Sequence, residues 1–149
     1  MRISRIELLS PAVLGAAALT TLPAATAVSA AADRPCAAST RWEGDRKCYT
    51  ATAQGVALVD LHIQTMRGRD HARAEGMVEE GGAVWMEVKK NGGPAKRVYL
   101  KRVPKGGPEN PYAESRQKST GWQYDGPGYL VRGCAANAGD RLKACTGWH

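Results

Sequence analysis

Alternation along the chain, with apolar or β-branched residues at every second position, is the strongest pattern in this sequence. It runs through residues 59–65 (Val-Asp-Leu-His-Ile-Gln-Thr), and it recurs over 84–89 (Val-Trp-Met-Glu-Val-Lys). A period of two is typical of a β-strand with one buried face and one solvated face. Helical periodicity is nearly absent, so the chain is expected to fold from strands.

The clearest local element is a β-hairpin over residues 83–103. Asn91-Gly92 follows the alternating run 84–89, and alternation resumes over 97–103. Asn-Gly accepts positive φ at both central positions of a tight turn, which makes it a strong hairpin signal. Weaker strand signals cover 49–53, 72–78, 121–124 and a last hairpin from 129–134 and 141–146, and a long polar loop is expected over 104–119.

About seven short strands at this spacing predict an all-β domain. The fold class that we expect is an antiparallel β-sandwich, immunoglobulin-like, or alternatively a small barrel.

The first 30 residues have the features of a secretory signal peptide. Arg2 and Arg5 form a basic start, 8–27 is a run of small and apolar residues, and 28–30 (Val-Ser-Ala) is a small-residue cleavage pattern. We expect cleavage near Ala30 and export of residues 31–149 as a single domain. The leader is weakly hydrophobic and contains two prolines, so a retained membrane helix is the less favoured alternative.

All four cysteines, Cys36, Cys48, Cys134 and Cys145, follow the leader. An even number of cysteines in an exported chain predicts two disulfides, with three possible pairings. We favour Cys36–Cys48 and Cys134–Cys145 because each pair is close in sequence; a bridge between the chain ends, such as Cys36–Cys145, is the alternative. No C-x₂-C pair is present, which disfavours a zinc site.

Net charge indicates the kind of partner. Cleavage leaves 119 residues and lowers the formal charge from +7 to +6, because Arg2, Arg5 and Glu7 are lost. A basic extracellular protein is attracted to anionic surfaces such as cell-wall polymers, although the charge can also serve solubility alone. No nucleic-acid reader motif is present, so no specific nucleic-acid partner is expected, and we expect a monomer.

Several short motifs carry a resemblance. They are 82–85 (Gly-Ala-Val-Trp), 91–93 (Asn-Gly-Gly), 124–127 (Tyr-Asp-Gly-Pro), 131–134 (Val-Arg-Gly-Cys) and 144–148 (Ala-Cys-Thr-Gly-Trp). Together with the alanine-rich leader, they resemble small secreted β-rich proteins of actinobacteria, of the Streptomyces type. The resemblance covers roughly the second half of the exported chain. It implies export and a β fold, and it carries over no functional residue.

His62 is the best candidate for acid–base or metal chemistry. It shares a strand face with Asp60 and Gln64, and the pair Asp70-His71 can approach it across a hairpin. Imidazole and carboxylate together suit a metal site or a general base. The alternation also explains these residues as the solvated face of a strand, and we favour that interpretation.

Common motifs for metal-assisted and for nucleophilic catalysis are absent from the sequence. There is no H-E-x-x-H or G-x-S-x-G stretch, and the serines that follow the leader, Ser39, Ser115 and Ser119, have no base nearby in sequence. We therefore expect neither an enzyme nor a bound cofactor or metal.

Two groups of side chains are candidates for ligand contact. Trp85, Trp122 and Tyr124 offer flat rings that can stack on sugars, unless they belong to the core. Alternation also places Lys89, Arg97 and Lys101 on one face of the 83–103 hairpin as a positive patch. Protection of a sheet edge against aggregation is the alternative role for these lysines and the arginine.

These observations favour a secreted, non-enzymatic binding module that acts at the cell envelope or on extracellular anionic or polysaccharide polymers. One alternative is a secreted inhibitor of an extracellular hydrolase, which would present the 104–119 loop. The other is a metal-assisted hydrolase that uses His62 and Asp60.

Overall fold

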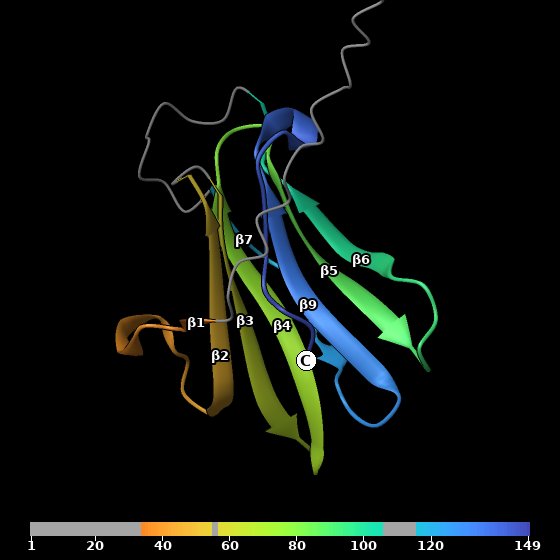
Figure 1. Cartoon of the computed structure of the whole chain (residues 1–149). Coiled ribbons are helices and arrows are strands. Elements are labelled where there is room, and N and C mark those ends of the chain that lie inside the picture. Colours follow the sequence, from red (N-terminus) through yellow and green to blue (C-terminus); the bar gives the residue numbers. More distant parts are fainter. Residues whose placement is uncertain (1–33, 55–56, 106–115) are drawn as a thin grey trace, which may run out of the picture.

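The computed structural model describes residues 34–54, 57–105 and 116–149. These residues form two antiparallel β-sheets that face each other across a shared core (Figure 1). The predicted signal peptide, residues 1–30, lies outside the described residues. No helix in the described part of the chain is long and apolar enough to cross a membrane.

Sheet A has six strands in the order β1-β2-β3-β4-β7, with β8 also paired to β4. These strands are β1 (Arg34–Pro35), β2 (Asp45–Ala53), β3 (Ala57–Met66), β4 (Arg69–Val78), β7 (Gln117–Ser119) and β8 (Gln123–Tyr124). A short 3-10 turn, η1 (Ala38–Thr40), lies in the connection from β1 to β2.

Sheet B has four strands in the order β10-β9-β5-β6. Its strands are β5 (Ala83–Lys90), β6 (Lys96–Arg102), β9 (Tyr129–Ala136) and β10 (Lys143–Cys145), and η3 (Ala138–Asp140) connects β9 to β10. The all-β, antiparallel sandwich predicted from alternation is therefore confirmed.

The core is built on the apolar positions of the alternating strands. The inward positions of β3 and β5 are buried, and they pack with the apolar side chains of β4 and β9. The core includes Val59, Leu61, Ile63, Ala72, Ala74, Val78, Val84, Met86, Val88, Val131 and Ala135. Burial of this apolar surface is the main stabilising term in such a fold.

Small residues let the two sheets approach closely at one point. A Cβ added to Gly133 on β9 would lie 3.0 Å from the Cβ of Ala74 on β4 and 3.1 Å from a methyl of Val59 on β3. Contacts at that distance require the neighbours to move, so a larger side chain at Gly133 would overpack the core.

The 83–103 hairpin is confirmed, with one irregularity. Asn91 and Gly92 both adopt positive φ in its turn, at 49° and 73°. Between the pairs Met86–Val98 and Val84–Lys101 the register shifts, so β6 carries one extra residue, and Tyr99 has a φ of 54°. A β-bulge of this kind reverses the alternation along a strand.

The bulge changes the face on which Lys101 lies. Lys101 pairs with the inward-facing Val84, whereas Arg97 pairs with Glu87 on the outer face. The prediction that Lys89, Arg97 and Lys101 share one face is therefore wrong for Lys101. An extra residue in one strand leaves no signal in a simple alternating pattern.

Both favoured disulfides are confirmed, Cys36–Cys48 and Cys134–Cys145, with Cα–Cα distances of 5.3 and 4.1 Å. Cys36–Cys48 attaches the segment after β1 to β2, and Cys134–Cys145 joins β9 to β10. Of the predicted 104–119 loop, residues 106–115 lie outside the described residues. Residues 117–119, the last three of the predicted loop, form β7 and pair with β4, so the loop ends earlier than expected.

Candidate functional site

The outer face of sheet A holds a buried polar cluster. His62 is fully buried and Asp60 is only 6% exposed, so the interpretation of these residues as a solvated face is wrong. Trp42 covers His62, because the rings are nearly parallel, with their centroids 4.0 Å apart. Trp42 belongs to the segment between β1 and β2 that the Cys36–Cys48 disulfide fastens to the sheet.

Asp45 organises this cluster from the start of β2. Its carboxylate accepts hydrogen bonds from His62 Nδ1 at 2.7 Å, from the backbone N–H of Trp42 at 2.8 Å and from Gln64 Nε2 at 3.0 Å. Burial by itself would raise the pKa of Asp45, but these hydrogen bonds outweigh it, and the pKa is lowered. Because an ionised carboxylate only accepts, the proton of the bond to His62 is on Nδ1.

The other ring nitrogen of His62 faces Glu75. His62 Nε2 lies 3.9 Å from Glu75 Oε2, which is beyond hydrogen-bonding distance, and it has no hydrogen-bond partner among the described residues. The second oxygen of Glu75, Oε1, accepts a hydrogen bond of 3.0 Å from Ser119 on β7. Glu75 Oε2 thus faces a buried nitrogen, and no residue of the described ranges donates a hydrogen bond to this oxygen.

Asp60 and Glu75 form a pair of carboxyl groups in a pocket. They are directly opposite each other on β3 and β4, and they line a cavity of about 370 Å³. Burial raises the pKa of Asp60, and the charge of Glu75 adds to this, against a hydrogen bond from Thr50 and the nearby His62. Such volumes are typical of small-molecule sites.

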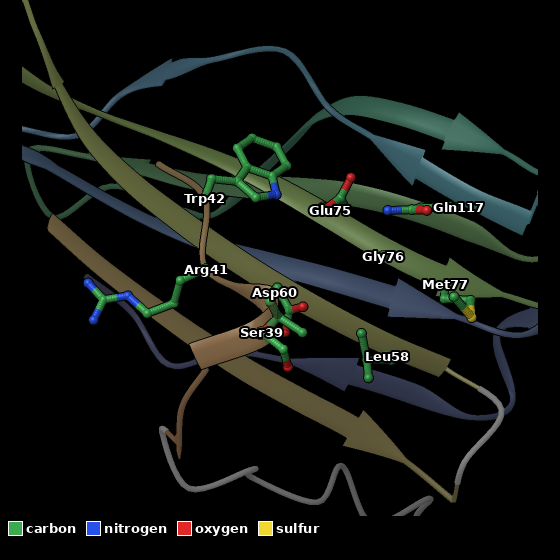
Figure 2. Close-up of a pocket in the computed structure, with 10 residues that line it drawn as sticks. Ser39, Arg41, Trp42, Leu58, Asp60, Glu75, Gly76, Met77 and Gln117 are labelled. Carbon is green, nitrogen blue, oxygen red and sulfur yellow. The ribbon is translucent and has the colours of Figure 1, made fainter. Parts of the chain in front are cut away.

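The rest of the pocket wall is mixed (Figure 2). Figure 2 shows Asp60 and Glu75 between Trp42 on one side and Leu58 and Met77 on the other. The remaining lining residues are Ser39, Thr40, Arg41, Gly76 and Gln117. Leu58 and Met77 are a cross-strand pair and are 38% and 56% exposed, which is unusual for apolar side chains of this size.

A three-ligand metal centre does not fit this cluster. Donor atoms of Asp45, Cys48 and His62 lie within 4.8 Å of one another. However, the sulfur of Cys48 is in a disulfide and offers no thiolate, and His62 Nδ1 already donates to Asp45. The hypothesis of a metal-assisted hydrolase at His62 and Asp60 gains no support from this donor set.

The outer face of sheet B carries cations fixed on indole rings. Trp85 is fully buried beneath Arg97 and Lys143, whose charged groups lie 4.1 and 5.1 Å from its ring centroid. Trp148, near the C-terminus, has Lys89 at 4.4 Å and Arg132 at 4.5 Å. Cations at these distances are attracted by the negative face of the ring. We call Lys89, Arg97, Arg132 and Lys143 the cationic face.

Glu87 is a buried counter-ion on this face. Its carboxylate accepts hydrogen bonds from Trp85 Nε1 at 3.1 Å, Arg132 Nε at 2.8 Å and Lys143 Nζ at 3.0 Å. Burial by itself would raise the pKa of Glu87, but these donors lower it to about 2. Lys89 and Arg97 form no ion pair with a carboxylate of residues 34–54, 57–105 or 116–149.

The structure separates the predicted binding residues. Lys89, Arg97 and Trp85 lie together on sheet B, but Trp85 is covered by cations and has no free ring face. Tyr124 instead lies on β8 of sheet A and Trp122 directly before that strand. Trp122 meets Trp42 edge-on at 6.2 Å, and Tyr124 meets His71 edge-on at 5.9 Å. The three predicted aromatic residues do not form one platform.

The side chains of His71 and Asp70 have different neighbours. His71 pairs with Gln64 and so lies on the same face of sheet A as His62, but its ring meets Tyr124 edge-on and Nδ1 lies 3.1 Å from the carbonyl oxygen of Arg69. Asp70 is bound to Arg46 in an ion pair of 2.8 Å and does not join the cluster around His62.

Sequence reasoning missed six residues of these two faces. They are Trp42, Asp45, Glu75, Arg132, Lys143 and Trp148. Glu75 could have been found, because a hairpin turning at Arg67-Gly68 places it opposite Asp60. Trp42 had no such signal, since it lies in an irregular segment whose position depends on a disulfide.

The chain matches no protein-family model, no curated protein sequence and no solved structure. The resemblance to small secreted actinobacterial proteins therefore stays a prediction.

Proposed function

We propose that the protein is an exported, non-enzymatic binding module that attaches to anionic polymers of the cell envelope through the cationic face of sheet B. The observation that carries this proposal is the arrangement of Lys89, Arg97, Arg132 and Lys143 around two indole rings, with one buried carboxylate, Glu87, among them.

The arrangement favours anion binding for a physical reason. Arg97 and Lys143 are held against Trp85, and Lys89 and Arg132 against Trp148, so these long side chains lose little freedom when a ligand binds. Arg97 additionally offers a planar fork of donors that fits a phosphate or carboxylate group. Arg132 and Lys143 already donate hydrogen bonds to Glu87, so Lys89 and Arg97 are left as the main ligand contacts.

Stacking of sugar rings on Trp85 is a weaker explanation. Trp85 is fully buried, with Arg97 and Lys143 over its ring. A sugar would first have to displace both cations. The role of Trp85 in this proposal is to support the charged side chains.

The test is co-sedimentation of the purified protein with intact cell walls, peptidoglycan and chitin, at low and high salt. We expect binding to the anionic walls that falls steeply between 50 and 500 mM salt, because contacts between exposed charges are screened. The variant Lys89→Gln/Arg97→Gln should lose most of this binding. Lys96→Gln/Lys101→Gln is the matched control, because it also removes two charges, and both lysines are exposed but pair with the inward-facing Val88 and Val84, off the cationic face.

Two results would contradict the proposal. One is equal retention on walls and on uncharged chitin at high salt, which indicates recognition of sugar. The other is a loss in Lys96→Gln/Lys101→Gln as large as in Lys89→Gln/Arg97→Gln, which indicates attraction by net charge without a defined face.

A further inference from the structure

The pocket on the outer face of sheet A contains negative charge without a matching cation. Within the described ranges, neither Asp60 nor Glu75 forms an ion pair with a lysine or arginine. His62 Nε2, at 3.9 Å from Glu75 Oε2, is too far to donate a hydrogen bond. Two adjacent carboxylates that are partly shielded from water repel each other unless a cation or a proton joins them.

The nearby arginines are directed elsewhere. Arg41 lines the pocket, but its guanidinium donates to the backbone carbonyl of Asp45 at 3.0 Å, and Figure 2 shows it pointing away from the two carboxyl groups. Arg73 lies over the rings of Trp42 and Trp122, at 5.0 and 5.9 Å from their centroids. This deficit of positive charge is notable in a chain with a formal charge of +7.

The apolar part of the pocket adds a second requirement for the ligand. Leu58 and Met77 are exposed next to the carboxyl pair, as cross-strand neighbours two residues away along β3 and β4. A ligand that places a charged group between Asp60 and Glu75 and an apolar stem over Leu58 and Met77 would satisfy both parts. The cavity volume of about 370 Å³ suits such a small group.

We propose that this pocket binds an organic cation, an ammonium or guanidinium group carried on a short apolar stem. Asp60 and Glu75 accept its hydrogen bonds, with Glu75 Oε2 as the free acceptor, and Leu58 and Met77 cover the stem. Charged hydrogen bonds to two carboxylates provide selectivity for the cation over a neutral molecule of the same shape. The proposal is independent of wall binding, because it concerns the other sheet.

The test titrates the protein with n-butylguanidinium, n-butylammonium and, as the neutral counterpart, n-butanol, followed by chemical shifts of backbone amides. We expect saturable shifts around Asp60 and Glu75 with at least one cation and none with butanol. Asp60→Asn and Glu75→Gln should each weaken binding roughly tenfold or more. Asp140→Asn is the control, because it removes the same charge from the exposed η3 turn.

Each other outcome would overturn the inference. Equal binding of butanol means an apolar pocket, and shifts that persist in both carboxyl variants mean a site elsewhere. Absence of saturable binding by either cation also rejects it. Should Asp60→Asn fail to fold, Glu75→Gln decides alone, since the side chain of Glu75 is 20% exposed and its replacement perturbs the core less.

Discussion

Glu87 shows how one side chain controls a surface of this protein. It is 8% exposed, and it accepts hydrogen bonds from Trp85, Arg132 and Lys143, which come from β5, β9 and β10. Its carboxylate stabilises the fold by joining three strands of sheet B. It also sets which cations remain for a ligand, because Arg132 and Lys143 are already engaged.

The pKa of Glu87 gives a prediction for stability against pH. The pKa is lowered from 4.5 to about 2 on folding, so the native state favours the ionised form. Its contribution is complete above pH 4.5 and is lost as the pH falls through about 2. It amounts to at most about 3 kcal/mol at neutral pH, because Arg132 and Lys143 are partly exposed and water screens part of the attraction. Urea unfolding of the wild type and of Glu87→Gln should differ by that order at pH 7.

The same measurement in acid provides the control. Other carboxyl groups titrate in both proteins, so the difference between wild type and Glu87→Gln isolates Glu87. We expect this difference to shrink steadily from pH 4.5 towards pH 2. A difference that stays constant over this range would mean that Glu87 acts through packing and not through its charge.

At the level of elements, the connection from β1 to β2 determines the environment of sheet A. It carries Trp42, which covers His62 and lines the pocket, and Cys36–Cys48 holds it in place. The backbone N–H of Trp42 and the ring of His62 both donate to Asp45, so the connection and the sheet share one acceptor.

Removal of this disulfide should therefore open the outer face of sheet A. We expect Cys36→Ala/Cys48→Ala to lose about 3 kcal/mol of stability, as for a loop of this length. The Trp42 amide should also exchange with solvent much faster than amides of the β3 core. Hydrogen exchange followed by NMR measures both effects.

Cys134→Ala/Cys145→Ala is the matched comparison. It opens a loop of similar length, with a sequence separation of 11 against 12, on the other sheet. It should cost a similar amount of stability but leave Trp42 protected. Equal exchange of Trp42 in the two double variants would show that the disulfide does not hold this segment.

In the whole molecule, the two candidate ligand surfaces lie on opposite outer faces of the sandwich. The cationic face belongs to sheet B and the carboxyl pocket to sheet A, with the apolar core between them. Replacing a charged side chain on one outer face by a neutral one of the same size leaves the core packing in place, so it should have little effect on the other outer face. Such substitutions at separate sites usually act additively.

A substitution on one surface should therefore reduce binding at that surface and leave binding at the other unchanged. Lys89→Gln/Arg97→Gln should reduce wall binding while leaving the affinity for n-butylguanidinium within about twofold, as expected for uncoupled sites. Glu75→Gln should do the reverse. Both properties can be measured on each variant by co-sedimentation and NMR titration, and a joint loss in either variant would show that the sites are coupled or that the variant is misfolded.

Much of this fold followed from local sequence. The strands at 59–65 and 84–89 and the Asn91-Gly92 turn were identified because alternation and turn chemistry act over a few residues. The pairing of Cys36 with Cys48 and of Cys134 with Cys145 followed for the same reason, since each pair is separated by a short segment. Such features need no knowledge of distant contacts.

The candidate site was decided by tertiary structure. Alternation placed Asp60 and His62 on the outer face correctly, but it could not show that Trp42 covers His62, because that contact depends on a disulfide and an irregular segment. The bulge at Tyr99, which moved Lys101 off the cationic face, was equally hidden. Local pattern determined which residues point outward, and long-range packing decided which of them meet water, a ring or another charge.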